Sequence, residues 1–190
     1  MFSDRQKEII TTSVNIIADK GIQGLTIKNL SKEIGISEAA IYRHFDSKTE
    51  ILMAILKSFE HGSKNFLNHD KNMNAIERIS DFFQRMLVTF QERPSIISVI
   101  FSEEIFNNDK ELSALIHTIM KNNQDYINGI IKEGQNTNMF RNDINSDYLT
   151  LYLTGALHLM VKEWHFRALG DDLIKKGNNL LKSFFELITV

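Results

Sequence analysis

Three adjacent side chains, Tyr42, Arg43 and His44, carry polar groups that could bind nucleic acid. A guanidinium can donate two hydrogen bonds to O6 and N7 of guanine, and phenol and imidazole groups can reach phosphate oxygens or base edges. Ile41 and Phe45 are four residues apart, so they share one helix face and leave Tyr42 and Arg43 on the other. The spacing predicts a short helix with an exposed polar face.

The preceding stretch predicts a second short helix, joined to the first by a glycine turn. Thr26 is suited to cap its start, and the apolar residues at positions 27, 30 and 34 share one face. Gly35 suits the left-handed conformation that ends a helix, and Ser37 can cap the helix that follows. Two short helices joined by such a turn form a helix-turn-helix.

Longer helices are predicted on both sides of this motif. Ser3-x-x-Gln6 is a capping box that opens a helix over residues 4–20, and Gly21 marks its end. Ser47-x-x-Glu50 is a second capping box that opens a longer helix. These two helices would buttress the short ones, which are too small to fold alone.

The run GLTIKNLSKEIGISEAAIYRHFDSKTEIL resembles the N-terminal DNA-binding domain of the TetR family of bacterial transcriptional regulators. The resemblance covers residues 5–56, where Gly-x-Thr, Gly-x-Ser and Tyr-x-His-Phe-x-x-Lys elements occur in register, and it is diffuse beyond residue 60. It implies an all-α fold. A three-helix helix-turn-helix domain (residues 1–50, with a connecting helix from about 47) would precede a helical domain (51–190) that binds ligand and dimerises.

Matching the family motif residue by residue implies DNA contacts at nine positions. Lys48, near a helix N-terminus, could pair with a phosphate, and Thr26 and Lys28 lie at another N-terminus, which favours anions. Glu38 departs from the family pattern: its carboxylate could accept from a cytosine amino group or repel phosphate. A solvated polar helix face is the alternative interpretation. The nine positions are Thr26, Lys28, Ser37, Glu38, Ala39, Tyr42, Arg43, His44 and Lys48.

Phenylalanine and methionine recur at helical spacing between residues 50 and 140. Such side chains can line an apolar ligand pocket, although core packing explains any one of them as well. Because the family binds small molecules in this domain, we expect a cavity here, and the few charges favour an apolar or amphipathic effector. The candidate lining is Phe82, Phe83, Met86, Phe90, Phe101, Phe106, Met120, Tyr152 and Trp164.

The C-terminal stretch DYLTLYLTGALHLMVKEWHFRAL is apolar along two helix faces, and residues 173–188 repeat this pattern. A helix that is apolar on two sides must be buried on two sides, and one monomer cannot easily cover four such stripes. Pairing with the two-fold mates in a four-helix bundle would cover them. The candidate dimer interface is Leu151, Leu159, Phe166, Leu181, Phe184 and Ile188.

Composition limits the remaining classes. The chain has 190 residues, a net charge of −2 and no cysteine, which excludes disulfides and thiolate metal sites. Residues 1–50 hold seven basic and seven acidic side chains, so DNA binding must depend on their local placement. The N-terminal residues lack the features of a signal peptide, and no apolar run reaches the length of a membrane span. We expect a cytoplasmic protein without cofactor or membrane partner.

Histidines provide the competing hypothesis. His158 and His165 are seven residues apart on one predicted helix, and His61 with His69 and Asp70 faintly resembles a metal-dependent phosphohydrolase. The sequence favours a dimeric repressor, not an enzyme, which binds a palindromic operator and is released by its effector. The alternatives are an all-helical metal-dependent hydrolase and a helical lipid- or drug-binding module without DNA affinity.

Overall fold

The computed structural model describes residues 2–66, 73–102, 109–167 and 172–190. All regular elements in these ranges are helices, and the β structure in them is one isolated bridge between Phe140 and Thr189, which confirms the all-α class. The chain divides into two compact units, residues 1–62 with 93–117 and residues 63–92 with 118–190. The first unit is thus larger than the expected domain of residues 1–50.

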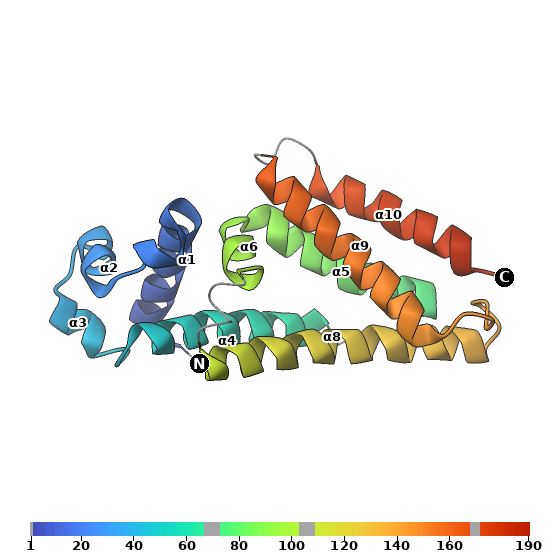
Figure 1. The fold of residues 1–190 in the computed structure, drawn as a ribbon, viewed down its shortest axis with the longest axis horizontal. Coiled ribbons are helices and arrows are strands. Elements are labelled where there is room, and N and C mark those ends of the chain that lie inside the picture. Colours follow the sequence, from blue (N-terminus) through green and yellow to red (C-terminus); the bar gives the residue numbers. More distant parts are fainter. Residues whose placement is uncertain (1, 67–72, 103–108, 168–171) are drawn as a thin grey trace. The chain divides into compact units, whose positions relative to one another are not determined.

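The first unit contains the helix-turn-helix (Figure 1). Its elements are α1 (Asp4–Gly24), α2 (Ile27–Ile34), α3 (Glu38–Tyr42), most of α4 (Lys48–Phe66), α6 (Ser95–Ile100) and the first turns of α8 (Lys110–Asn136). Helix α6 packs against α1, although the two are about 70 residues apart in the chain. This packing explains why the unit extends beyond the N-terminal segment.

Helix α1 begins and turns where the sequence predicts. Ser3 and Gln6 form both hydrogen bonds of the capping box. Gly21 has φ 68°, a conformation that glycine adopts at little cost, and the helix is kinked there before it ends at Gly24. The helix therefore extends to Gly24, beyond the predicted range of residues 4–20, and Gly21 marks the kink within it.

The two short helices have the predicted caps and turn. Thr26 and Ser37 each accept a backbone N–H from the first turn of their helix, and Gly35 adopts a left-handed conformation with φ 78°. Leu30 and Ile41 are fully buried. Each short helix is thus fixed by a polar cap at its start and an apolar anchor on its inner face.

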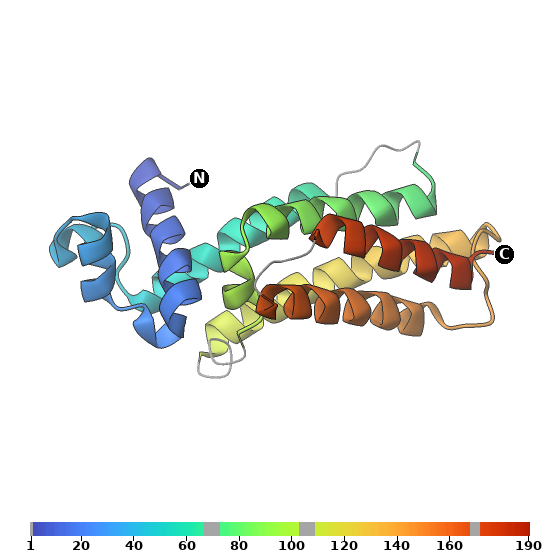
Figure 2. The same ribbon diagram turned by 90° about the horizontal axis from the view of Figure 1, so that it is seen from above.

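The second unit contains α5 (Ala75–Glu92), the remainder of α8, α9 (Ser146–Phe166) and α10 (Leu173–Ile188). Helix α10 packs against both α5 and α9 (Figure 2). One apolar core joins all four helices, and its buried residues are Ala75, Ile79, Phe82, Phe83, Ile127, Ile130, Ile131, Phe140, Leu149, Leu153, Leu157, Leu181 and Ile188.

Helix α9 has one buried and one exposed apolar face. Leu149, Leu153 and Trp164 are buried, whereas Leu151 and Leu159, on the other predicted stripe, are more than half exposed. The sequence predicted both stripes, and the monomer covers only one of them. Within the described ranges, the helices fall short of the length and apolarity that a membrane span requires.

Candidate functional site

The predicted DNA-contact residues gather on the helix-turn-helix of the first unit. Seven of them are exposed, and His44 and Lys48 are partly buried. Tyr42 is the last residue of α3 and is 49% exposed, and Arg43 follows it as the C-cap. The exposed residues are Thr26, Lys28, Ser37, Glu38, Ala39, Tyr42 and Arg43.

The hydroxyl groups of Thr26 and Ser37 cap their helices as hydrogen-bond acceptors. The Oγ1 of Thr26 accepts from the amide of Asn29 at 3.0 Å, and the Oγ of Ser37 accepts from the amide of Ala40 at 3.1 Å. Because a hydroxyl both accepts and donates, each O–H can still donate to an oxygen outside the protein, such as that of a phosphate. Capping and phosphate contact are therefore compatible roles for these two residues.

Lys48 makes a contact that its position in the sequence does not predict. Its Nζ donates to the backbone carbonyl of Ile22 at 2.9 Å and so joins the first turn of α4 to the end of α1. The expected contact of Lys48 with a phosphate stays a prediction. The second predicted capping box, Ser47-x-x-Glu50, forms in part. The hydroxyl of Ser47 accepts from the amide of Glu50, whereas the Glu50 carboxylate accepts from the amide of Asp46 and not from that of Ser47.

Gln6 is a residue whose second role the sequence did not reveal. Its Oε1 accepts from the amide of Ser3 at 3.0 Å, as the capping box predicts, while its Nε2 donates to the carbonyl of His44 at 3.4 Å. These two partners are 3 and 38 residues away. A bond between residues this far apart leaves no local pattern in a single sequence.

The expected pocket residues do not share one environment. Phe82, Phe83, Phe90 and Trp164 are buried, and Met86 packs against the core. The ring centroids of Phe82 and Phe83 are 5.2 Å apart in an edge-to-face arrangement, which is ordinary core packing.

The other expected pocket residues lie elsewhere. Met120 and Tyr152 are 47% and 60% exposed, so neither belongs to the buried cluster. Phe101 is half-buried in the first unit, and Phe106 lies outside the described residues. A ligand cavity with this lining stays a prediction.

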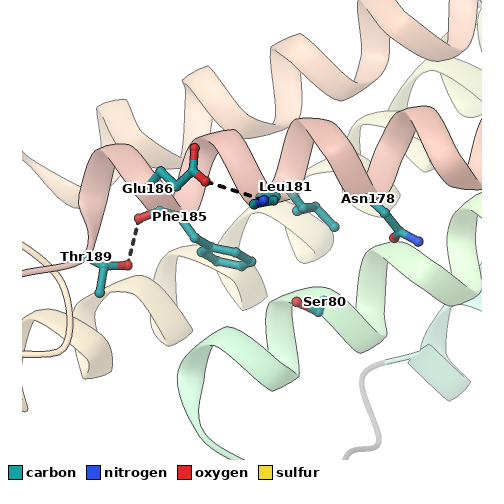
Figure 3. A pocket seen from close by; sticks show the side chains of 7 residues that line it. Ser80, Asn178, Leu181, Phe185, Glu186 and Thr189 are labelled. Atoms are coloured by element: carbon teal, nitrogen blue, oxygen red, sulfur yellow. Dashed lines mark hydrogen bonds and ion pairs between the residues drawn. The ribbon is translucent and has the colours of Figure 1, made fainter.

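A hollow of about 510 Å³ lies between α5 and α10 (Figure 3). Phe185 and Leu181 supply its apolar lining, and the Lys182–Glu186 ion pair, with 3.9 Å between Nζ and Oε1, lies at its rim. None of the predicted pocket residues lines it. Its full lining is Ser80, Asn178, Leu181, Lys182, Phe185, Glu186 and Thr189.

The predicted dimer residues separate into two groups. Leu151, Leu159 and Phe166 are 56%, 58% and 75% exposed, and Phe184 is partly buried. Leu181 and Ile188 are only 3% and 2% exposed and belong to the core of their own chain, so assigning them to an interface was wrong. Both faces of α10 carry apolar residues, and spacing alone does not say which face the monomer covers.

The histidines whose side chains the structure describes lie in no cluster that could bind a metal ion. Among the residues that the structure describes, no three His, Asp or Glu side chains are grouped as metal ligands would be. Burial lowers the pKa of His158 and His165, and the Lys162 ammonium lowers that of His158 further. The side chain of His61 and residues 69 and 70 lie outside the described residues.

This arrangement, two capped short helices with an exposed polar face, defines a DNA-binding protein of the helix-turn-helix class. Residues 9–55 match the family model described as "Bacterial regulatory proteins, tetR family", and residues 56–189 match that of "YsiA-like protein, C-terminal region". The chain belongs to the TetR family. The members of this family are DNA-binding transcriptional regulators and not enzymes, so we assign the chain no catalytic residue.

Individual relatives are distant. The chain is 26% identical over 116 residues to the nucleoid occlusion factor SlmA of Mannheimia succiniciproducens. The aligned segment covers 60% of this chain and 54% of that protein. The chain thus spans about half the length of the curated relatives that it matches at this level.

Two solved structures show the same fold over nearly the whole chain. The ketosteroid regulator KstR2 of Mycobacterium tuberculosis is 18% identical, with a TM-score of 0.83, and the match covers 100% of this chain and 97% of that chain. FadR of Bacillus subtilis, solved with stearoyl-CoA, is 18% identical with a TM-score of 0.77, and the match covers 94% of this chain and 97% of that chain.

Proposed function

We propose that this regulator is a repressor that binds an inverted-repeat operator as a homodimer and leaves it when a small apolar or amphipathic effector binds. The exposed polar end of α3, where Tyr42 and Arg43 project from a capped and anchored helix, carries the proposal. A helix presented in this way fits the major groove, where Arg can read guanine directly. As a regulator that binds DNA in a bacterial cell, the protein would act in the cytoplasm.

The exposed apolar face of α9 supports the dimer. Leu151, Leu159 and Phe166 repeat at helical spacing, and each is more than half exposed. A soluble monomer rarely presents such a face, and the same patch on a second copy could cover it around a two-fold axis. A two-fold dimer places its recognition helices about 34 Å apart, or a multiple of that, so the operator should be an inverted repeat.

The class of effector is supported by composition and by the names of similar structures. The core of the second unit is aromatic and aliphatic, so a cavity opened within it would favour apolar groups. One structure of the same fold is that of a ketosteroid regulator, and another holds stearoyl-CoA. We transfer only the chemical class, because both proteins are less than 20% identical to this chain.

Selection from a random DNA pool tests the operator. We expect the bound sequences to converge on an inverted repeat whose half-sites are one or more helical turns apart, and asymmetric sites would contradict the dimer geometry. If no sequence is enriched over the pool, the protein would be the helical binding module without specific DNA affinity.

Effector binding is tested on the selected operator. Acyl chains, aromatic compounds and lipophilic drugs are first screened by thermal shift, because a ligand that binds only the folded state raises the unfolding temperature. Hits are then tested for release from DNA. Since coupling is reciprocal, operator DNA should weaken effector binding by the same factor by which the effector weakens DNA binding. Tight binding that leaves operator affinity unchanged would contradict the proposed switch.

A further inference from the structure

We propose that Gln6 and Lys48 are positioning residues that hold the segment following α3, residues 43–48, against α1. Each donates from its side chain to a backbone carbonyl far away in the chain. Gln6 binds the carbonyl of His44, and Lys48 binds that of Ile22. The segment is thus attached near its start to the first turn of α1 and at its end to the last turns of α1. The proposal rests on operator recognition by Tyr42 and Arg43.

The oxygen and the nitrogen of the Gln6 side-chain amide have different partners. Its oxygen accepts from the amide of Ser3, which stabilises the start of α1. Its nitrogen donates to His44, whose carbonyl lies just beyond the end of α3. Glutamate could serve the capping box equally well, but its ionised carboxylate has no donor for His44. Glutamine at this position can therefore bind both the cap and His44, whereas glutamate can bind only the cap.

The charge of Lys48 favours a positioning role. Lys48 is the first residue of α4, where a cation is unfavourable because the helix N-terminus carries partial positive charge. The carbonyl of Ile22 lies in the last turn of α1, after the kink at Gly21, and a carbonyl oxygen at a helix end attracts a cation. The 2.9 Å bond to Ile22 brings the ammonium there. The tertiary contact thus accounts for a lysine that the local sequence of α4 disfavours.

This attachment matters more for specific than for non-specific DNA binding. Reading a base edge requires hydrogen-bond geometry within a fraction of an ångström, whereas attraction to the phosphate backbone depends mainly on charge. Residues 43–48 immediately follow Tyr42 and include Arg43. Buried Phe45 keeps the segment attached to the core, so loss of the two bonds loosens the segment and lets the Arg43 side chain depart from one orientation. The ratio of operator affinity to random-sequence affinity is then the quantity that the two anchors control.

The test for Gln6 uses two substitutions and one control. Gln6→Glu keeps the cap acceptor and removes the donor, whereas Gln6→Met removes both groups without adding charge. Ser3→Ala removes the cap hydroxyl and leaves the donor to His44. We expect both Gln6 variants to lower the affinity ratio by about 3- to 10-fold, the range for one hydrogen bond, and Ser3→Ala to leave it unchanged. An unchanged ratio in both Gln6 variants would overturn the role of Gln6.

The test for Lys48 compares it with an exposed lysine. Lys48→Met should lower the affinity ratio and the unfolding temperature of the DNA-free protein. Lys28→Met should lower binding to all sequences alike and reduce the salt dependence, because Lys28 is exposed at the start of α2. If Lys48→Met behaves as Lys28→Met does, with no change in unfolding temperature or in the ratio, Lys48 is a phosphate contact and not a positioning residue.

Hydrogen exchange of the DNA-free protein separates this proposal from the operator proposal. We expect the amides of residues 43–48 to exchange faster in Gln6→Glu, Gln6→Met and Lys48→Met than in the wild type, and Ser3→Ala and Lys28→Met to leave them unchanged. A wild type that selects no operator would defeat the proposed function and leave this measurement readable. Unchanged exchange in all three anchor variants would defeat the positioning role.

Discussion

The helix-turn-helix and the α9–α10 pair present surfaces of different chemical character. Around α2 and α3 most of the exposed side chains are polar, and the apolar side chains of Leu30 and Ile41 are fully buried. Along α9, by contrast, Leu151, Leu159 and Phe166 remain exposed after the core of the unit is complete. The first surface suits a charged, hydrated partner such as DNA, and the second suits an apolar partner.

The two surfaces are specified by residues at different distances along the chain. The polar surface is fixed locally, because caps at Thr26 and Ser37 and the turn at Gly35 set the two short helices within a few residues. The apolar surface depends on tertiary packing, because it consists of the apolar residues of α9 that α5, α8 and α10 leave exposed. Substitutions on the polar surface should therefore alter DNA binding, whereas substitutions on the apolar surface should alter dimerisation.

The largest effect is expected from charge placed in the core compared with charge on the exposed stripe. Leu181→Glu should destabilise the fold by about 4 kcal/mol or more, because Leu181 is 3% exposed and belongs to the apolar core of the second unit, where a charge is costly. Leu159→Glu should leave the monomer fold intact within about 0.5 kcal/mol and abolish the dimer, because Leu159 is 58% exposed.

Thermal unfolding and analytical ultracentrifugation of these two variants separate core from interface. A folded Leu159→Glu dimer would move the interface away from this stripe of α9. A stably folded Leu181→Glu protein would contradict the place of Leu181 in the core.

The next effect concerns base reading. Arg43→Ala should cost about 1–3 kcal/mol of operator affinity and relax the base preference at one position in each half-site, because a bidentate contact to guanine is lost. Repeating the selection from random DNA with the variant measures both changes. A variant that selects the wild-type operator unchanged would show that Arg43 does not read a base.

Loss of a helix cap compares the two units directly. Ser37→Ala at α3 and Asp172→Ala at α10 each remove one N-cap acceptor, and each should cost about 0.5–2 kcal/mol of stability. Only Ser37→Ala should also weaken DNA binding, because its hydroxyl lies on the predicted DNA-contact surface. Denaturant unfolding and an operator-binding assay on both variants provide the check. Equal losses of DNA affinity would mean that the caps act only through stability.

The smallest effect is a pH dependence of the second unit. Burial lowers the pKa of His158 and His165 below the ordinary value of 6.5, so the folded chain binds fewer protons than the unfolded chain in the range just below that value. Stability should therefore be complete above about pH 6.5 and decrease as the pH falls through it. Unfolding temperatures of the wild type and of a His158→Gln, His165→Gln double variant, measured from pH 8 to 5, should diverge only at the acidic end. Parallel curves would contradict this.

The sequence by itself determined the helix-turn-helix and the family. Caps and glycine turns depend on residues within four positions of each other, so Ser3, Thr26, Gly35 and Ser37 could be assigned without knowledge of the fold. The two apolar stripes of α9 were equally readable, because a helix repeats with a fixed period. Exposure of Tyr42 and Arg43 followed from the positions of Ile41 and Phe45.

Only the tertiary structure decided which apolar residues the chain buries for itself. Leu181, Ile188 and Leu159 are all apolar residues at helical spacing in the sequence. Only packing against other helices buries Leu181 and Ile188 and leaves Leu159 exposed. The bonds from Gln6 to His44 and from Lys48 to Ile22 likewise join residues 38 and 26 positions apart. Local spacing carries no record of such contacts, because they exist only once helices distant in the chain have packed together.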